Sequence, residues 1–323
     1  MAVMLSARAD AIPPVLVIAG PTASGKSALA LDVAAALPAT IINADSMQVY
    51  RELRVLTARP TPADEAKVPH RLFGVRAAAE PCSAGRWLRL AVSEIEAAHA
   101  AERLPIVVGG TGLYLKALLE GLAEVPEIPE AVTREARALH VRLGGVAFRE
   151  TLAALDPDAA GRLSASDSQR LIRAYAVARA TDRPLADWQR MSAPGPALNA
   201  RFAVIVLSPP RAALNAALDA RFDAMMAEGA LDEVRALLAL GLDPMLPALK
   251  AVGVPELRRF LDGDGSLAEA VAAAKGATRN FAKRQMTWLR HQIIADKVHP
   301  ARYGPEARAE IVDFVHRVVA GSG

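Results

Sequence analysis

The segment at residues 20–27 restricts the possible folds of this chain more than any other part of the sequence. It reads GPTASGKS and matches G-x-x-x-x-G-K-[ST], the pattern of a phosphate-binding loop. The apolar run before it, residues 12–19, predicts a buried strand, and residues 28–37 predict a helix that ends before Pro38. A strand–loop–helix unit of this kind binds phosphate through backbone N–H groups at the start of its helix.

The side chains of this segment, called the 20–27 loop below, add to that prediction. Lys26 supplies a positive charge for a terminal phosphate, and the hydroxyl of Ser27 can bind Mg²⁺. The pattern does not identify the phosphorylated molecule. The candidate phosphate-binding residues are Gly20, Pro21, Thr22, Ala23, Ser24, Gly25, Lys26 and Ser27.

The composition excludes several classes of protein. The only cysteine, Cys82, rules out a disulfide framework and suits a reducing cytoplasm. No apolar run approaches the roughly 20 residues that a membrane span needs, and the first ten residues lack the apolar region of a signal peptide. We therefore expect a cytoplasmic protein with no membrane partner. The net charge is only +3, but 31 of the 38 basic residues are arginine, so the placement of arginine is more informative than the total charge.

Strands and helices alternate along much of the chain. Further buried strands are predicted at residues 39–44, 104–108 and 201–207, and helices at residues 84–101, after an N-cap at Ser83, and 113–122. This order is typical of an α/β fold with a doubly wound parallel sheet. Ligands of such sheets bind at the carboxyl ends of the strands. The 20–27 loop, Asp45 and Thr111 should therefore lie together, whereas the proline-rich residues 46–69 are predicted as loop.

The composition changes after residue 125. Residues 126–199 contain ten arginines and no convincing strand, and this region ends near a Pro-Gly-Pro linker at residues 194–196. We predict an all-helical insertion at 126–199 within a catalytic core formed by residues 1–125 and 200–323. Within the insertion, residues 166–169 fit a capping box, and Arg170 and Arg173 share one helix face. Later helices of the core are predicted at residues 211–228, 230–240, 265–293 and 305–320.

Asp45 is the strongest candidate for chemistry. A carboxylate at a strand end beside a phosphate-binding loop can act as a general base, bind Mg²⁺ through water, or cap a helix. Residues 46–50 that follow it carry groups suited to reading the edge of a base. Thr111 either approaches a substrate or occupies a tight turn that needs its flanking glycines. Arg221 could reach a diphosphate, although the residue pattern alone favours a solvated helix face.

A second signal is a basic helix near the end of the chain. Residues 271–295 contain five lysines or arginines and no acidic residue. Lys275, Arg279 and Lys283 are spaced four apart, and Arg290 returns to the same face. Such a stripe suits a phosphate backbone, but many charged faces are only solvated. Cys82 and the six histidines show no metal-ligand spacing.

Seven segments in this order and spacing resemble the bacterial tRNA dimethylallyltransferases, also called tRNA isopentenyltransferases. The resemblance extends from about residue 15 to residue 290. The matching segments are GPTASGKS at 20–27, INADSMQVYR at 42–51, TARPT at 57–61, PHRL at 69–72, VGGTGLYLKALLEGL at 108–122, SDSQRLIRA at 166–174 and TRNFAKRQMTWLR at 278–290.

The resemblance implies transfer of a dimethylallyl group from dimethylallyl diphosphate to N6 of adenine 37 in the anticodon stem-loop of tRNA. It implies that the 20–27 loop holds the prenyl diphosphate, with Mg²⁺, that Asp45 is the general base, and that Arg221 contacts the diphosphate. Thr111 would contact the target adenine. Further tRNA contacts would come from Ser46, Met47, Gln48, Thr133, Gln169, Arg170, Leu171, Ile172 and Arg173, and we add Lys275, Arg279 and Lys283 from the basic helix.

The chain departs from the family pattern at three places. It reads Val-Gly-Val-Pro-Glu at 252–256, where members often read Val-Gly-Tyr-Arg-Gln, and Thr133 and Ala217 stand where arginines are common. Alternative functions are a small-molecule kinase, an adenylate isopentenyltransferase and a non-catalytic RNA-binding protein. The long arginine-rich insertion argues against a small acceptor, and Asp45 beside an intact loop argues against a mere binding module. No apolar seam in the sequence demands an obligate protein partner.

Overall fold

A computed structural model describes residues 12–191 and 195–321 of the chain. These residues divide into two compact units: residues 12–119 with 196–321, and residues 120–191 with Gly195. The two boundaries predicted from the sequence are 125/126 and 199/200. The first ten residues and Pro194 of the predicted linker lie outside the described residues.

The first unit is built on a six-stranded, all-parallel sheet with the order β3-β2-β4-β1-β5-β6. The predicted parallel α/β sheet is therefore confirmed, and two short edge strands, β3 and β6, were not predicted. The strands are β1 (Pro14–Ala19), β2 (Ala39–Asn43), β3 (His70–Arg71), β4 (Leu104–Gly109), β5 (Arg201–Leu207) and β6 (Lys297–His299).

The register of the central strands aligns their carboxyl ends. Ala19 of β1 lies opposite Gly109 of β4 and Val206 of β5, and Asn43 of β2 lies opposite Val108 of β4. The segments that follow β1, β2 and β4 therefore start at one edge of the sheet, which is where ligands bind in folds of this kind.

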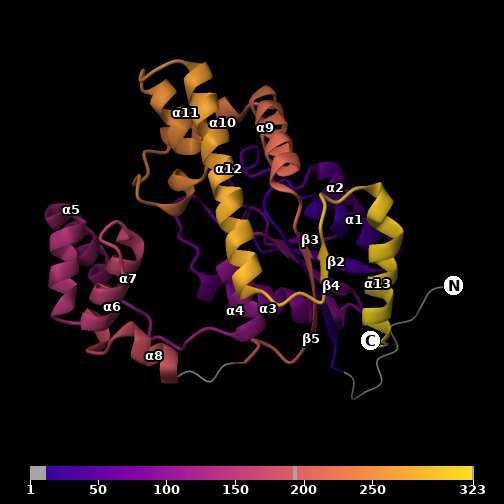
Figure 1. Cartoon of the computed structure of the whole chain (residues 1–323), viewed down its shortest axis with the longest axis horizontal. Helices are drawn as coiled ribbons and strands as arrows, with labels where there is room; N and C mark the ends of the chain where they lie inside the picture. Colours follow the sequence, from indigo (N-terminus) through magenta and orange to yellow (C-terminus); the bar gives the residue numbers. More distant parts are fainter. Residues whose placement is uncertain (1–11, 192–194, 322–323) are drawn as a thin grey trace. The chain divides into compact units, whose positions relative to one another are not determined.

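Helices cover both faces of this sheet, which explains why the central strands are continuously apolar. On one face, α1 (Lys26–Ala36) and α13 (Arg308–Ala320) pack against the alternate β1 side chains Leu16 and Ile18. On the other face, α3 (Ala84–Ala100) and α4 (Gly112–Glu120) pack against Val15 and Val17. Figure 1 shows α13 running beside α1 at one side of the strands.

The segment between β2 and α3 is more ordered than predicted. Instead of continuous loop, it contains the short helix α2 (Pro62–Lys67). The side chain of Thr61 accepts a hydrogen bond from the backbone of Asp64, whose carboxylate bonds back to Thr61. This capping box stabilises one and a half helical turns that have no buried residue and hence no apolar periodicity.

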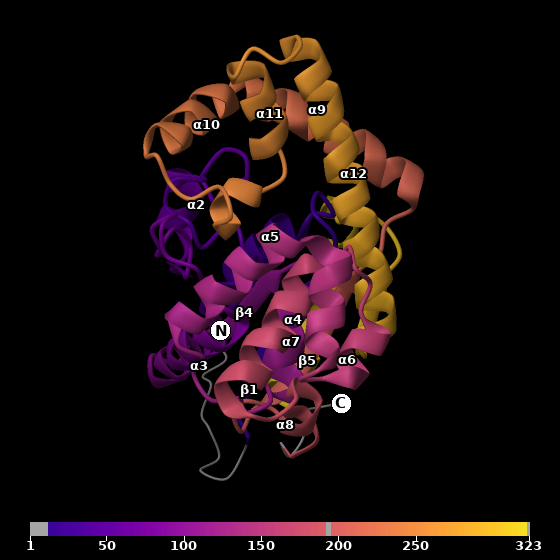
Figure 2. The ribbon, with the colours of Figure 1, turned by 90° about the vertical axis from the view of Figure 1, so that its left-hand side faces the viewer.

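The later helices of the first unit pack against one another. Helices α9, α11 and α12 lie side by side in both ribbon views (Figures 1 and 2), and α10 contacts α9 and α11. The predicted helices here are confirmed, but η1 and α11 were missed. The elements are α9 (Arg211–Ala227), α10 (Ala230–Ala239), η1 (Pro247–Lys250), α11 (Val254–Leu261) and α12 (Leu267–Gln292).

The second unit consists of four helices, and its described residues contain no strand. They are α5 (Glu130–Ala153), α6 (Pro157–Arg162), α7 (Ser168–Thr181) and α8 (Leu185–Met191). Helices α5, α6 and α7 pack together (Figure 2). The core of this unit includes Phe148, Leu152 and Tyr175. The predicted capping box at residues 166–169 is wrong: Asp167 is the N-cap, and its side chain accepts from the backbone N–H of Arg170.

The described helices include none that combines the length and the apolar character needed to cross a membrane.

Candidate active site

The 20–27 loop joins β1 to the first residue of α1, Lys26. Gly25 has φ 96°, in the left-handed region, and a Cβ there would collide with Tyr303. The backbone N–H of Tyr303 donates to Ser24 O (2.9 Å), so the segment after β6 supports the loop from behind. The unpaired N–H groups at the start of α1 and the positive end of its dipole are thereby held at the edge of the sheet.

Lys26 is half-buried in this loop, and its ammonium donates to Pro21 O (2.7 Å). Loss of solvent around the ammonium lowers the pKa of Lys26 to about 8. The negative charge of Asp45 opposes that change, and the positive charge of Arg221 adds to it. Lys26, Asp45 and Arg221 are thus close enough to influence one another electrostatically.

Arg221 extends from α9 to the loop. Its Nη1 donates to Thr22 Oγ1 (3.2 Å), and burial lowers the pKa of its guanidinium despite the opposing charge of Asp45. The solvated helix face favoured by the residue pattern is therefore wrong. Arg302, which the sequence analysis missed, donates from Nε to Ala23 O (3.1 Å), and its charge also acts on Arg221. Two arginines from outside the loop therefore bond to successive loop residues, Arg221 to Thr22 and Arg302 to Ala23.

Asp45 lies two residues beyond the end of β2. Its backbone N–H donates to Asn43 Oδ1 (2.8 Å), and its Oδ1 accepts from the backbone N–H of Met47 (2.9 Å). Residues 46–49 form a turn and not a helix, so the helix-cap interpretation of Asp45 is excluded. Among the hydrogen bonds of the described residues, none involves Oδ2, which leaves this oxygen free to accept a proton or bind a ligand.

Thr111 occupies the turn after β4, beside Asp45. Its Oγ1 accepts from the backbone N–H of Ser46 (2.9 Å), and its own N–H donates to Ala44 O (3.3 Å). A Cβ at Gly109 would collide with Ala44 O, and one at Gly112 would collide with the indole of Trp288. The glycines are therefore required by close packing, and the threonine hydroxyl links the turns after β2 and β4.

Gln48 is held near the same turn. Its Nε2 donates to Thr57 O (2.8 Å) and Ala58 O (3.1 Å), so only its carbonyl oxygen is left for a ligand. Ser46, Met47 and Gln48 are half-buried, whereas Val49 and Tyr50 are buried and have no surface for reading a base.

The basic stripe of α12 divides into two parts. Lys275 forms an ion pair with Asp223 (2.7 Å) and Arg279 with Asp219 (2.6 Å), both on α9. Lys283, Arg284 and Arg290 are exposed and have no ion pair among the described residues. The positive charge of the stripe is therefore compensated at its N-terminal end and uncompensated toward its C-terminal end.

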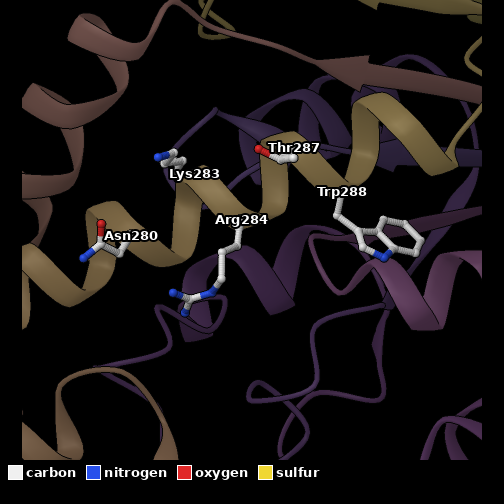
Figure 3. A pocket seen from close by; sticks show the side chains of 5 residues that line it. All are labelled: Asn280, Lys283, Arg284, Thr287 and Trp288. Atoms are coloured by element: carbon white, nitrogen blue, oxygen red, sulfur yellow. The ribbon is translucent and has the colours of Figure 1, made fainter. Parts of the chain in front are cut away.

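Two pockets lie along the surface of α12, and no residue of the 20–27 loop lines either of them. An open pocket of about 440 Å³ is lined by Asn280, Lys283, Arg284, Thr287 and Trp288 (Figure 3). In Figure 3, Lys283 and Arg284 point to different sides of the helix. The second pocket, of about 200 Å³, lies between α9 and α12 and includes Arg211, Arg279 and Arg290.

The predicted tRNA residues of the second unit differ in exposure. Gln169, Arg170 and Arg173 on α7 are exposed, and Thr133 on α5 is half-buried. Leu171 and Ile172 are buried in the core of this unit, so their side chains support the surface and do not form part of it. The tRNA contact predicted for these two residues stays a prediction.

The described residues offer few side chains that could bind a metal ion. No group of three or more histidine, cysteine or acidic side chains that could hold a metal occurs among the described residues. Ser27 is exposed in the first turn of α1. This suits Mg²⁺, which commonly takes one or two protein ligands and completes its shell with phosphate oxygens and water.

Fold and site together define an α/β protein in which a glycine-containing loop at a helix N-terminus and a carboxylate lie at one edge of a parallel sheet. The IPP transferase family model matches residues 48–292 of the chain. The tRNA dimethylallyltransferase of Rhodospirillum centenum is 59% identical over 282 residues, covering 87% of this chain and 90% of that protein. That of Rhodospirillum rubrum is 59% identical over 285 residues, covering 88% and 87%. The chain therefore belongs to the IPP transferase family, and the resemblance seen in the sequence is confirmed.

Solved structures are similar over nearly the whole chain. The full-length tRNA isopentenylpyrophosphate transferase of Bacillus halodurans is 29% identical, with a TM-score of 0.70 over 97% of this chain and 98% of that one. A eukaryotic dimethylallyltransferase acting on tRNA has a TM-score of 0.81 over 96% of this chain and 80% of that one. At 24% identity, the second comparison shows a shared fold.

Proposed function

We propose that this protein transfers the dimethylallyl group of dimethylallyl diphosphate to N6 of adenine 37 in tRNA, releasing diphosphate. The observation that carries the proposal is the cluster of Lys26, Arg221 and Asp45 at one edge of the sheet. Two cations and the start of a helix favour a leaving diphosphate, and a carboxylate with a free oxygen favours the loss of a proton from the nucleophile.

The chemistry needs both halves of this site. The exocyclic amine of adenine is a poor nucleophile because its lone pair is delocalised into the ring. In the proposed step, N6 forms a bond to C1 of the prenyl group, the carbon that carries the diphosphate, while the bond from C1 to the diphosphate oxygen breaks. Oδ2 of Asp45 takes the N6 proton, and Lys26, Arg221 and the N–H groups of the loop stabilise the charge on the diphosphate.

Mg²⁺ is part of this proposal as an ion that would be bound by the diphosphate oxygens. When bound, it would neutralise negative charge on the leaving group. Ser27 is the residue of this chain that would hold it, because its hydroxyl is exposed in the first turn of α1. The dimethylallyl diphosphate would supply the anionic ligands, and water would complete the shell.

Recognition of tRNA would rest on cations at exposed positions. Arg170 and Arg173 of α7, and Lys283 and Arg290 of α12, suit contacts with the phosphates of an anticodon stem-loop. The target adenine must leave its stack to reach a base at a strand end, as in other base-modifying enzymes. Thr111, Ser46 and the free carbonyl oxygen of Gln48 are the polar groups beside Asp45 that could hold it.

Mass spectrometry of nucleosides tests the proposal directly. The tRNA is incubated with the protein, dimethylallyl diphosphate and Mg²⁺, then digested; we expect isopentenyladenosine that is absent without protein. AMP and ATP are offered in parallel as acceptor and phosphoryl donor. Prenylated AMP with unmodified tRNA would identify an adenylate isopentenyltransferase, and an ATP-dependent phosphorylated product would identify a kinase.

A further inference from the structure

Gln285 lies near the middle of α12 and is one of the few buried polar side chains among the described residues, with 6% of its surface exposed. Its Oε1 accepts from the backbone N–H of Thr22 (2.9 Å), in the 20–27 loop. Its Nε2 donates to Gly110 O (2.9 Å), in the turn after β4. One amide therefore joins two segments that are 88 residues apart in the sequence and both distant from α12.

Only a side chain that donates and accepts at once can make this bridge. A primary amide does so, whereas an ionised carboxylate only accepts and a methionine does neither effectively. The N–H of Thr22 and the carbonyl of Gly110 bond to Gln285 at a buried position. If either group lost this hydrogen bond, it would stay shielded from water and would destabilise the folded protein. Because the N–H of Thr22 donates to Gln285 Oε1, this N–H is not available to bind an anion.

The bridge continues on the side of Asp45. Gly110 is followed by Thr111, which bonds to Ala44 and Ser46 on either side of Asp45. The turn after β4 is tightly packed against α12: a Cβ at Gly110 would collide with the Gln285 amide, and one at Gly112 would collide with Trp288. The loop assigned to the diphosphate and the turn assigned to the adenine are thus held to the same turn of the same helix.

We propose that Gln285 is a positioning residue that keeps the leaving-group loop and the acceptor turn in register for the transfer of the prenyl group. This inference rests on the function proposed above. Gln285 does not touch the reacting atoms: it acts through Thr22 and Gly110. A misplacement of about 1 Å between reacting groups can slow a reaction on the order of 100-fold without a comparable loss of binding.

The test compares Gln285→Met and Gln285→Glu with Gln292→Met. Methionine keeps the chain length and loses both hydrogen bonds, and ionised glutamate can accept from Thr22 but cannot donate to Gly110. Gln292 is a matched control on the same helix, where its Oε1 accepts from Lys116 Nζ (2.8 Å) at an exposed position. Single-turnover prenyl transfer at saturating substrates, the Kd for dimethylallyl diphosphate, thermal melting and amide hydrogen exchange are measured for each.

We expect Gln285→Met and Gln285→Glu to lower the single-turnover rate about 10- to 100-fold, and Gln285→Met to leave the Kd within about threefold. Amide exchange should rise in both the 20–27 loop and residues 109–112, and Gln292→Met should match the wild type. The inference is overturned if both variants keep the wild-type rate, if Kd rises as much as the rate falls, or if exchange changes in only one segment. It is also overturned if the variants unfold at the assay temperature, because Gln285 would then be needed for folding and not for alignment.

The exchange measurement separates this inference from the proposed function. If the wild-type protein transferred no prenyl group to tRNA, the proposed function would fail. Faster exchange in both segments of Gln285→Met would still support the bridge, and unchanged exchange would reject it.

Discussion

Lys26 is a residue of the 20–27 loop whose pKa is strongly altered by its surroundings. Burial lowers its pKa to about 8, and a lysine with a lowered pKa is charged below that value and neutral above it. A diphosphate binds to the charged form, because the neutral amine offers no ion pair. The affinity for dimethylallyl diphosphate should therefore be highest below pH 8.

We expect the Kd for dimethylallyl diphosphate to rise about tenfold between pH 7 and pH 9, as the free protein loses the proton of Lys26. Calorimetric titrations across this range measure it. Lys26→Arg is the control, because its guanidinium stays charged throughout: its affinity should be weaker at pH 7 but nearly constant with pH. A constant Kd for the wild type over this range would show that Lys26 is not the titrating cation.

The contacts of Gln285 and Arg302 with the 20–27 loop could not be predicted from the sequence. Gln285 lies 263 residues from Thr22, and Arg302 lies 279 residues from Ala23. Gln285 lies in the matching segment 278–290, but that segment assigned it no role, and Arg302 lies in none of the matching segments. Only the packing of α12 and of the segment after β6 shows what these two side chains contact. The proximity of the 20–27 loop, Asp45 and Thr111 could be predicted, because parallel strands place their carboxyl ends at one edge.

At the level of elements, α12 combines two roles on different faces. Gln285 is buried and bonds to the loop after β1 and to the turn after β4. The exposed cations Lys283 and Arg284 point to different sides of the helix (Figure 3). Lys275 and Arg279, which were predicted to contact tRNA, form ion pairs that link α12 to α9. We infer that the uncompensated cations nearer the C-terminus of α12 contribute more to RNA affinity.

The salt dependence of tRNA binding tests this division. The double variant Lys283→Gln with Arg290→Gln should reduce the slope of log K against log salt by about two, one for each lost phosphate contact. A control variant, Lys275→Gln with Asp223→Asn, removes one ion pair without changing the net charge and should leave the slope unaltered. Equal slopes for both double variants would contradict the assignment of α12 cations to tRNA phosphates.

The elements that could be predicted are those with a long apolar pattern. Strand β5 and helices α9, α10 and α12 agree with the predicted ranges within two residues, because each has a buried face of several residues. Strands β3 and β6 have two and three residues and no buried position. Helix α11 has eight residues with Pro255 in its first turn, and such short elements depend on tertiary packing for their existence.

At the level of the whole molecule, the helical unit is inserted at a single point of the first unit. The backbone N–H of Ala197 donates to Leu118 O (3.2 Å), so the chain leaves and re-enters the first unit at neighbouring positions. A short linker can therefore replace the insertion without stretching the parallel sheet or its helices.

We expect a variant in which residues 120–195 are replaced by a short Gly-Ser linker to fold and to bind dimethylallyl diphosphate, because the 20–27 loop and Arg221 belong to the first unit. It should not modify tRNA detectably, since Arg170 and Arg173 are removed. Circular dichroism, donor titration and nucleoside mass spectrometry check the three parts. Undiminished tRNA modification would show that the insertion has no part in recognition.

The most direct test of the central claim, a leaving-group loop that faces a proton-accepting carboxylate, is the single-turnover rate of Asp45→Ala compared with its Kd for dimethylallyl diphosphate. Asp64→Ala is the control, because Asp64 also accepts a backbone hydrogen bond but lies on α2. We predict that Asp45→Ala lowers the rate of prenyl transfer by roughly two to four orders of magnitude while the Kd stays nearly unchanged, and that Asp64→Ala keeps the wild-type rate. A wild-type rate for Asp45→Ala would contradict the account.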